Sequence, residues 1–540
     1  MNRIVPTRTQ SFIKGAMILT VAGIIIKIIG AVNKIYISRM LGGEGIGLYQ
    51  MAALLYATMT SLATAGIPTA ISILVAERLA LRDGPGVLRI RSISFWLLFV
   101  LGAICSLGLY TSAELLVDSH VVYDPRAVLG IKAVAPALLV VTLVSSFRGY
   151  FQGFQDMVPT ATSQLFEQIV RVLTMFVLAF FLLPHGLTYA AAGAAFSAVP
   201  STLVALLILL IYFYRQRKVR ATLQVTCDDV VHSWRKVPAT QLVKALLLLA
   251  IPVSLANVMM PIMNMVDLVI APKRLVEALG YSVEDATAAF GYLTGMASSL
   301  INLPIIFTTS LAASLVPAIS EAHALKNHQG VMHRTEQAFK MTLLFTLPAA
   351  IGMMALAEPI SSMLYATPNA GGAIFVLSLS IVLLGLQQVS TGVLQGLGYA
   401  SLPMWNLGIG MIFKVLVTWI LLGMESIAIE GAAWGTNAAF GIAAGLNVFY
   451  ISKYASYRIS IGELIKILGA VSFMGVSAYG AHYALLPIVG NEMAVLGAIL
   501  VALVLYGGSV FALGIVVWDE LLSLPVIGKI FAKIRNKKYE

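Results

Sequence analysis

Stretches of about 20 mostly apolar residues follow one another along almost the whole chain, and this feature limits its possible folds more than any other. A helix of that length spans the hydrocarbon core of a bilayer. Only 11% of the 540 residues are charged, against about 25% in soluble proteins. The sequence also lacks the alternation that is typical of a β-barrel. It therefore predicts an all-α polytopic membrane protein.

Fourteen apolar segments are expected to cross the membrane as helices. They lie near residues 13–37, 46–75, 90–113, 127–147, 159–183, 189–214, 241–270, 287–317, 338–363, 370–396, 403–423, 428–452, 463–486 and 492–517. With both ends inside, the cytoplasmic parts hold about 25 Lys and Arg residues and the outer loops about four, as this topology requires. We therefore expect both termini in the cytoplasm and a first helix that is retained rather than cleaved as a signal peptide.

The remaining composition argues against several other classes of protein. The net charge of +11 is attributed to cytoplasmic loops, and no nucleic-acid partner is expected. Cys105 and Cys227 predict neither a disulfide nor a metal site. His323, His328 and His333 share no helix face, so no metal is expected there either. Motifs of hydrolases, kinases and zinc proteases are lacking, and the chain is not expected to be an enzyme.

The two halves of the chain repeat one another. FRGYFQG at residues 147–153 returns as STGVLQG at residues 390–396, and Arg171-Val172-Leu173 returns at the same offset as Lys414-Val415-Leu416. Helices 1–6 and 7–12 are therefore expected to be two copies of one unit. Because six is even, both copies enter the membrane from the same side and form parallel repeats, with helices 13 and 14 as an appended pair.

This repeat predicts four parts of the chain. The expected N-lobe covers residues 1–214, a basic cytoplasmic linker residues 215–240, the C-lobe residues 241–453, and the appended helices and basic tail residues 454–540. Two homologous lobes can rock about a site between them and expose it to either side in turn. The pattern therefore favours a transporter that works by alternating access.

Cations at membrane depth are the main candidates for a substrate site. A lipid-facing cation costs about 2.5–3.5 kcal/mol on insertion scales, so such residues usually face an interior cavity. The candidates for a cationic substrate cavity are Lys27, Lys34, Arg148, Arg171 and Lys414. Three of them can instead serve elsewhere: Arg171 can pair with Glu167 one helical turn away, Lys34 can reach the interface, and Arg148 can anchor a helix end.

A wet cavity lined by cations favours an anion, and phosphate esters are common anionic metabolites. Arginine grips phosphate through two hydrogen bonds and lysine acts as a point charge. An anionic, lipid-linked headgroup fits such a cavity.

Further polar residues are candidates for supporting roles. Asn257, Asn264 and Asp267 share one helix face and are candidates for a coupling cation or a sugar, or else for hydrogen bonds between helices. Asn33 and Glu167 are further candidates for polar positions of the cavity or for coupling. Glu77 and Glu321 end helices 2 and 8 and are candidates for a gate, or else solvated helix ends.

Three motifs resemble a known family. LGGEGIGLYQ at residues 41–50, FRGYFQG at 147–153 and EQIVRVL at 167–173 are similar to the polysaccharide-biosynthesis and SpoVB-like branch of the multidrug/oligosaccharidyl-lipid/polysaccharide (MOP) exporter superfamily. Within it, the MurJ-like lipid II flippases of Gram-positive bacteria are the nearest resemblance. The resemblance covers essentially the whole chain and implies a MATE-like fold in the bacterial cytoplasmic membrane.

The resemblance also implies a mechanism and a substrate. It implies a central cationic cavity, a lipid-tail groove formed by helices 13 and 14, and transfer of lipid II for peptidoglycan of the cell wall, and so for cell shape. It places the basic position of helix 1 at Lys27. Asn33-Lys34 stands where Gram-negative members have Arg-Asp. A further cavity arginine of the Gram-negative members aligns near Thr60, so this chain lacks it.

Other functions stay open at this point. The substrate can be another undecaprenyl-diphosphate-linked oligosaccharide, such as a capsule or spore-cortex unit. A cation-coupled multidrug exporter is the next alternative, although its deep charges would be acidic. A membrane glycosyltransferase would need paired carboxylates, which the sequence lacks. No cofactor is expected; the driving force is Na⁺, H⁺ or the membrane potential, and cell-wall synthesis proteins are possible partners besides the bilayer.

Overall fold

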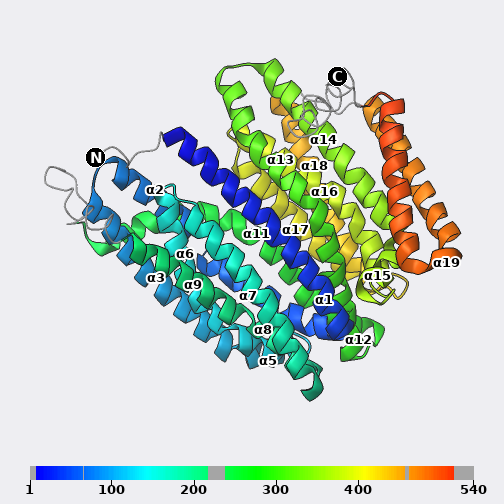
Figure 1. The fold of residues 1–540 in the computed structure, drawn as a ribbon, viewed down its shortest axis with the longest axis horizontal. Coiled ribbons are helices and arrows are strands. Elements are labelled where there is room, and N and C mark those ends of the chain that lie inside the picture. Colours follow the sequence, from blue (N-terminus) through cyan, green and yellow to red (C-terminus); the bar gives the residue numbers. More distant parts are fainter. Residues whose placement is uncertain (1–7, 65, 217–236, 456–460, 516–540) are drawn as a thin grey trace, which may run out of the picture. The chain divides into compact units, whose positions relative to one another are not determined.

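A computed structural model describes residues 8–64, 66–216, 237–455 and 461–515, and every regular element within these ranges is helical (Figure 1). The fold class predicted from the sequence, an all-α membrane protein, is therefore confirmed. Most of the expected linker, with Cys227, and the basic tail from residue 516 lie outside the described residues.

The first half of the chain forms nine α-helices and one short 3₁₀ turn within the described residues. They are α1 (Arg8–Thr64), α2 (Ile67–Ala80), α3 (Gly84–Thr111), α4 (Ala113–Asp118), α5 (Ala127–Val134), α6 (Pro136–Gly153), α7 (Val158–Leu182), the 3₁₀ turn η1 (Leu183–His185), α8 (Leu187–Phe196) and α9 (Ala198–Arg215).

The second half is also helical. Its elements are α11 (Ala239–Leu279), α12 (Val283–Gly291), the π-helical segment η2 (Tyr292–Ala297), α13 (Ser298–Ala324), α14 (His328–Ala355), α15 (Ala357–Tyr365), α16 (Gly371–Gly396), α17 (Ser401–Leu421), α18 (Glu430–Ala455) and α19 (Ile461–Ala512).

Ten helical runs in the described part of the chain are long and apolar enough to cross a membrane. Two of them, Val21–Ala80 and Gly462–Ala512, contain 60 and 51 residues, two to three times the roughly 20 residues that one crossing needs. Both runs are broken by a glycine with positive φ, Gly42 (66°) in α1 and Gly490 (75°) in α19, a conformation that costs glycine nothing. The expected number of fourteen crossings stays a prediction.

The chain divides into two compact units. Unit 1 comprises Met1–Leu303 and Val415–Ala432, and unit 2 comprises Pro304–Lys414 and Ala433–Glu540. The divisions fall inside α13, α17 and α18. These compact units are not the lobes expected from the sequence repeat, and the lobe boundaries stay a prediction.

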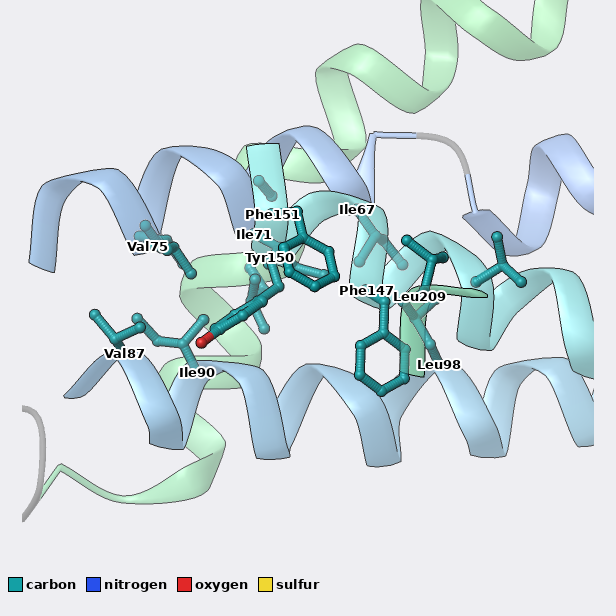
Figure 2. Close-up of a cluster of buried hydrophobic side chains, with 14 of the residues drawn as sticks. Ile67, Ile71, Val75, Val87, Ile90, Leu98, Phe147, Tyr150, Phe151 and Leu209 are labelled. Carbon is teal, nitrogen blue, oxygen red and sulfur yellow. The ribbon is translucent and has the colours of Figure 1, made fainter. Parts of the chain in front are cut away.

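Unit 1 has an apolar core between α2, α3, α6, α9 and the start of α11 (Figure 2). Phe147, Tyr150 and Phe151 come from α6 and pack against aliphatic residues of the neighbouring helices. Phe147 also makes an edge-to-face contact with Phe213 of α9, with ring centroids 5.5 Å apart. Each buried aromatic ring of this kind removes about 150–250 Å² from solvent, so α6 is firmly held within unit 1.

The repeated glycines of the sequence allow a close contact between two helices in each unit. In unit 1 a Cβ atom at Gly149 would lie 2.7 Å from the carbonyl oxygen of Pro68, so α6 and α2 approach closely there. In unit 2 a Cβ atom at Gly392 would lie 2.9 Å from the carbonyl oxygen of Ala312, so α16 approaches α13 in the same way. The matching motifs therefore mark equivalent helix contacts, as expected of two copies.

Candidate functional site

Lys27 and Lys34 lie on the face of α1 that approaches α7. Gly30 lies between them, three residues after Lys27 and four before Lys34, so the three share one side of the helix. A Cβ atom at Gly30 would lie 3.3 Å from Nε2 of Gln168 on α7. The Lys27 side chain is exposed and Lys34 is half-buried, whereas Asn33 is buried and its Nδ2 donates to Sδ of Met175 at 3.0 Å. Both lysines therefore lie on the side of α1 where Gly30 approaches Gln168 of α7.

The centre of the candidate site is a carboxylate shared by two arginines. One oxygen of Glu167, on α7, accepts a hydrogen bond from Nη2 of Arg148 on α6 at 2.8 Å. The other oxygen accepts from Nη2 of Arg171, one turn along α7, at 2.7 Å. The Glu167–Arg171 contact is the ion pair that the spacing of four residues allows. Arg148 lies in the same network and does not serve only as an anchor at a helix end.

Two buried serines hold the arginines on their other side. Nε of Arg148 donates to the Ser163 hydroxyl oxygen at 3.2 Å, and Nε of Arg171 donates to that of Ser201 at 3.3 Å. Each serine hydroxyl in turn donates to a backbone carbonyl of its own helix, at 2.8 and 3.0 Å. None of these four hydrogen bonds involves Glu167. The serines therefore orient both guanidinium groups independently of the carboxylate.

Tyrosines of α1 complete the surroundings of this network. Tyr49 and Tyr56 lie near Arg171, and Tyr56 also lies near Glu167 and Arg148. We name the set Arg148, Glu167, Arg171, Ser163 and Ser201 the arginine network. It holds two positive charges and one negative charge. With Lys27 and Lys34 nearby on α1, this part of unit 1 carries an excess of positive charge and suits an anion.

The arginine network remains partly open. The side chains of Arg148, Glu167 and Arg171 are 16%, 14% and 28% exposed. Ser163 and Ser201 are buried. Part of each charged side chain is therefore accessible, while the serines that orient the arginines are buried.

Two of the same positions of the repeat belong to a network of neutral groups in unit 2. The offset of 243 residues aligns Arg148 with Thr391, Ser163 with Asn406 and Glu167 with Gly410. Nδ2 of Asn406 donates to Oδ1 of Asn447 on α18 at 2.8 Å, and Nδ2 of Asn447 donates to Oγ1 of Thr391 at 3.3 Å. Amide and hydroxyl groups therefore connect α16, α17 and α18 in unit 2.

Lys414, the counterpart of Arg171, is almost completely buried, with 1% of its surface exposed. One turn earlier, a side chain at Gly410 would collide with the backbone of Ala439 on α18. The close approach of α17 and α18 at Gly410 accounts for the burial of Lys414. Of the two aligned cations, Arg171 is thus partly open and Lys414 is enclosed.

The remaining residues predicted from the sequence are spread over other helices. Asn264 is exposed on α11 and Asp267 is buried there, whereas the side chain of Asn257 lies outside the described ones. Glu77 pairs with the adjacent Arg78 at 2.6 Å, and Glu321 pairs with Arg334 at 3.3 Å.

Sequence reasoning missed a polar contact between the start of α5 and α12. Asp124 is completely buried, and its Oδ2 accepts from Oγ1 of Thr287 at 2.8 Å and from Nη2 of Arg126 at 2.7 Å. Nη1 of Arg126 also donates to Glu44 at 2.5 Å. These hydrogen bonds, with Asp124 first, raise the pKa of Arg126 above its ordinary value. Residues 163 positions apart gave no signal in the sequence.

Glycines bring α1 close to α12 and η2 in the same region. Side chains at Gly43 or Gly47 would collide with Tyr292 and with the backbone of Thr287 respectively. Nε2 of Gln50 donates to the carbonyl oxygen of Thr294 at 2.7 Å, within the π-helical segment. A π-helical turn frees backbone groups from the regular ladder, and α1 uses one of them to close this end of unit 1.

Unit 2 contains an apolar cavity of about 430 Å³ between α14, α15 and α19. Its lining includes Phe345, Pro348, Met353, Met474 and Leu503, and Tyr506 closes one side by donating from its hydroxyl to Leu344 at 2.7 Å. A cavity of this size and lining suits hydrocarbon.

Comparisons with known proteins agree with this architecture. The family model described as "Polysaccharide biosynthesis protein" matches residues 12–323, more than half of the chain, and the model described as "MatE" matches residues 252–420. Stage V sporulation protein B of Bacillus subtilis (strain 168) is 30% identical over 524 residues, which are 97% of this chain and 99% of that protein. Lipid II flippase MurJ of the same organism is 27% identical over 494 residues, 87% and 88% of the two chains.

Solved structures show the same fold at lower identity. An inward-facing MATE family transporter of the MOP superfamily has a TM-score of 0.66 at 15% identity, over 80% of this chain and 94% of that one. Lipid II flippase MurJ in an inward closed conformation has a TM-score of 0.64 at 16% identity, over 91% and 98%. The predicted MATE-like arrangement is therefore confirmed.

Proposed function

The chain belongs to the polysaccharide biosynthesis protein family and is a flippase of the MOP superfamily rather than an enzyme; from that premise we propose that it moves lipid II, the lipid-linked peptidoglycan precursor, from the inner to the outer leaflet. In this proposal the substrate is undecaprenyl-diphosphate carrying a saccharide, both termini are cytoplasmic, and the transport cycle is alternating access. The Bacillus subtilis relative named Lipid II flippase MurJ supports this choice of substrate.

The observation that carries the proposal is the group of cations of unit 1 at membrane depth. Lys27 and Lys34 face α7, where Arg171 lies near the helix centre, and Arg148 reaches the same place from α6. Several cations at this depth are costly unless an anion uses them. A diphosphate offers charge and oxygen acceptors in the geometry that guanidinium groups bind well.

The apolar cavity of unit 2 supports the lipid part of the proposal. A prenyl chain is pure hydrocarbon and needs a lining without hydrogen-bonding groups. The residues around the cavity between α14, α15 and α19 meet this need almost throughout. In the proposed assignment this cavity holds part of the undecaprenyl chain, which is the role that the family resemblance implies for the last two helices.

The contact between α1 and α12 supports the alternating-access part. If both termini are cytoplasmic, the kink at Gly42 and the neighbouring contacts of Gly43, Gly47 and Asp124 lie at the outer end of unit 1. Small residues and a few hydrogen bonds make this a contact that can open and close without exposing a large apolar surface. The outer end of unit 1 would then be the gate toward the outer leaflet.

A second substrate is favoured by a specific comparison. The relative named Stage V sporulation protein B shares 30% identity over 97% of the chain, against 27% over 87% for the relative named Lipid II flippase MurJ. A lipid-linked saccharide used in sporulation is therefore the alternative. It shares the prenyl diphosphate with lipid II, so the same cations would serve either substrate.

Complementation of a flippase-depleted bacterial strain tests the proposal. The wild-type chain should restore growth and peptidoglycan synthesis. Lys27→Ala should insert in the membrane but fail to restore growth, because it removes the most exposed deep cation of α1. Lys466→Ala, an exposed lysine of α19, is the matched control and should restore growth fully. Full growth with Lys27→Ala would contradict the proposed role, and no rescue by wild type would favour the sporulation substrate.

A further inference from the structure

We propose that Glu167 is a built-in competitor for the transported anion: its carboxylate occupies Arg148 and Arg171 in the empty carrier, and a phosphate group of the substrate replaces it there. This inference rests on the proposed function, because it takes the substrate to be a prenyl diphosphate. It adds a step that binding alone does not include, the exchange of an internal anion for an external one.

The geometry of Glu167 is that of a bridging anion. Each of its two oxygens binds a different guanidinium group, at 2.8 Å and 2.7 Å. A phosphate group also has several acceptor oxygens and can bridge two arginines in this way. Glu167 therefore occupies the position in which a bridging phosphate oxygen pair would make the same contacts.

The arginines are prepared for the exchange. Ser163 and Ser201 accept from the Nε atoms of Arg148 and Arg171, and neither serine contacts Glu167 in the hydrogen bonds of the network. When the carboxylate leaves, the serines still hold the two guanidinium groups in place. A ligand thus meets an oriented pair of donors and does not have to order them, which lowers the cost of binding.

The second copy of the repeat joins its helices without counterparts of the Arg148 and Glu167 charges, although it keeps a cation, Lys414, in place of Arg171. Unit 2 has Thr391, Asn406 and Gly410 where unit 1 has Arg148, Ser163 and Glu167. There, Asn406, Asn447 and Thr391 connect the helices through neutral hydrogen bonds. A structural role alone would be served by such a network. The charged version in unit 1 therefore calls for a role in the transport of an anion.

An internal competitor solves two problems of an anion carrier. Two uncompensated arginines at membrane depth would be costly in the empty state, and Glu167 halves their net charge. A pair of free arginines would also bind a diphosphate tightly and release it slowly. When Glu167 returns to the arginines, it lowers the affinity and helps the product to leave.

Binding of farnesyl diphosphate to the purified full-length protein tests the exchange. In Glu167→Gln the competing charge is gone, so affinity should rise by about tenfold, the value expected from one lost charge-assisted hydrogen bond. In Arg171→Gln a ligand group is lost and affinity should fall by about tenfold. Glu114→Gln is the matched control: it breaks another Glu–Lys/Arg pair, with Lys132 at 2.6 Å, in an exposed position, and should bind as wild type.

Flipping in proteoliposomes gives the second readout. Glu167→Gln should flip a prenyl-diphosphate-linked substrate more slowly than wild type although it binds the probe more tightly, because release is slowed. A purely structural role of Glu167 would lower binding and flipping together. Equal or weaker binding by folded Glu167→Gln would overturn the proposal.

A second variant keeps the test decisive if Glu167→Gln does not fold. The shorter carboxylate of Glu167→Asp cannot bridge both guanidinium groups, so affinity for farnesyl diphosphate should rise by about threefold, a fraction of one such hydrogen bond. Unchanged or weaker binding by this variant would overturn the inference. Failure of the wild-type protein to bind any prenyl diphosphate would refute the proposed function itself, so the two failures are distinguishable.

Discussion

Asp124→Asn tests whether the polar contact between α5 and α12 stabilises unit 1. The carboxylate of Asp124 is completely buried and accepts four hydrogen bonds, three from Arg126 at 2.7–3.0 Å and one from Thr287 at 2.8 Å. Asparagine keeps one acceptor oxygen, and its amide can donate to Thr287. It loses the charge and the bond from Nη2 of Arg126.

The size of the effect follows from this geometry. Breaking a buried ion pair costs about 3–5 kcal/mol. The Arg126 side chain is 30% exposed and keeps its contact with Glu44, so screening and the remaining partner reduce the loss to about 2 kcal/mol. For a chain of 540 residues this lowers the apparent Tm by about 2 °C.

Thermal unfolding of the purified protein in detergent measures the loss. Asp118→Asn, an exposed carboxylate at the end of α4, is the control and should melt with the wild type. The difference in Tm between wild type and Asp124→Asn should not change between about pH 6 and pH 9. The pKa of Arg126 is raised in the folded protein, so the stability from the Arg126 charge is fully present below the ordinary arginine pKa. That stability is lost only as the pH rises through the still higher pKa of the folded state. Wild-type melting of Asp124→Asn would refute the reasoning.

Three further changes give separate tests. Gly149→Leu should prevent the close approach of α6 to α2 and reduce the yield of folded protein measured by size-exclusion chromatography, because overpacking costs about 1–3 kcal/mol or more. A side chain at Gly108 meets open space, so the control Gly108→Leu should give the wild-type yield. Asp156→Asn should raise the apparent Tm at pH 8 and not at pH 4. Burial raises the pKa of the Asp156 carboxyl, so the wild-type protein loses stability as the pH rises and this carboxyl ionises in the folded state. The neutral asparagine avoids that loss. Gly352→Leu should fill part of the apolar cavity of unit 2 and slow flipping of a long-chain prenyl substrate more than that of a short-chain one, whereas Gly480→Leu, in open space, should affect neither; equal slowing of both substrates would contradict a role in holding the tail.

The helices were predictable because hydropathy alone decides which segments enter a bilayer. The repeat was also visible, since the glycines of FRGYFQG and STGVLQG are needed wherever two helices come into backbone contact. The number of crossings was harder to judge. Continuous helices such as α1 and α19 join two expected segments, and only the positive φ of Gly42 and Gly490 separates them.

The candidate site was only partly predictable. The Glu167–Arg171 pair follows from a spacing of four along one helix, but the contact of Glu167 with Arg148 joins two helices and has no local signal. Ser163 lies one turn before Glu167 and could have been found on that helix face. Ser201, on α9, could not.

The burial of Lys414 shows why the repeat does not predict two equivalent sites. The alignment with Arg171 gives the two residues the same place along equivalent helices. The glycine one turn earlier lets α17 approach α18, and the lysine is buried as a result. Packing at one small residue thus separates a partly open cation from an enclosed one.

In the proposed transport cycle, the arginine network of unit 1 receives the phosphate groups of the substrate. The most direct test is the flipping rate of fluorescent lipid II in proteoliposomes that contain equal amounts of folded wild type and of Arg148→Gln/Arg171→Gln. We predict that the double variant loses at least about tenfold in rate, as expected when charged hydrogen bonds to the substrate are removed. Flipping at the wild-type rate by the folded double variant would contradict this claim.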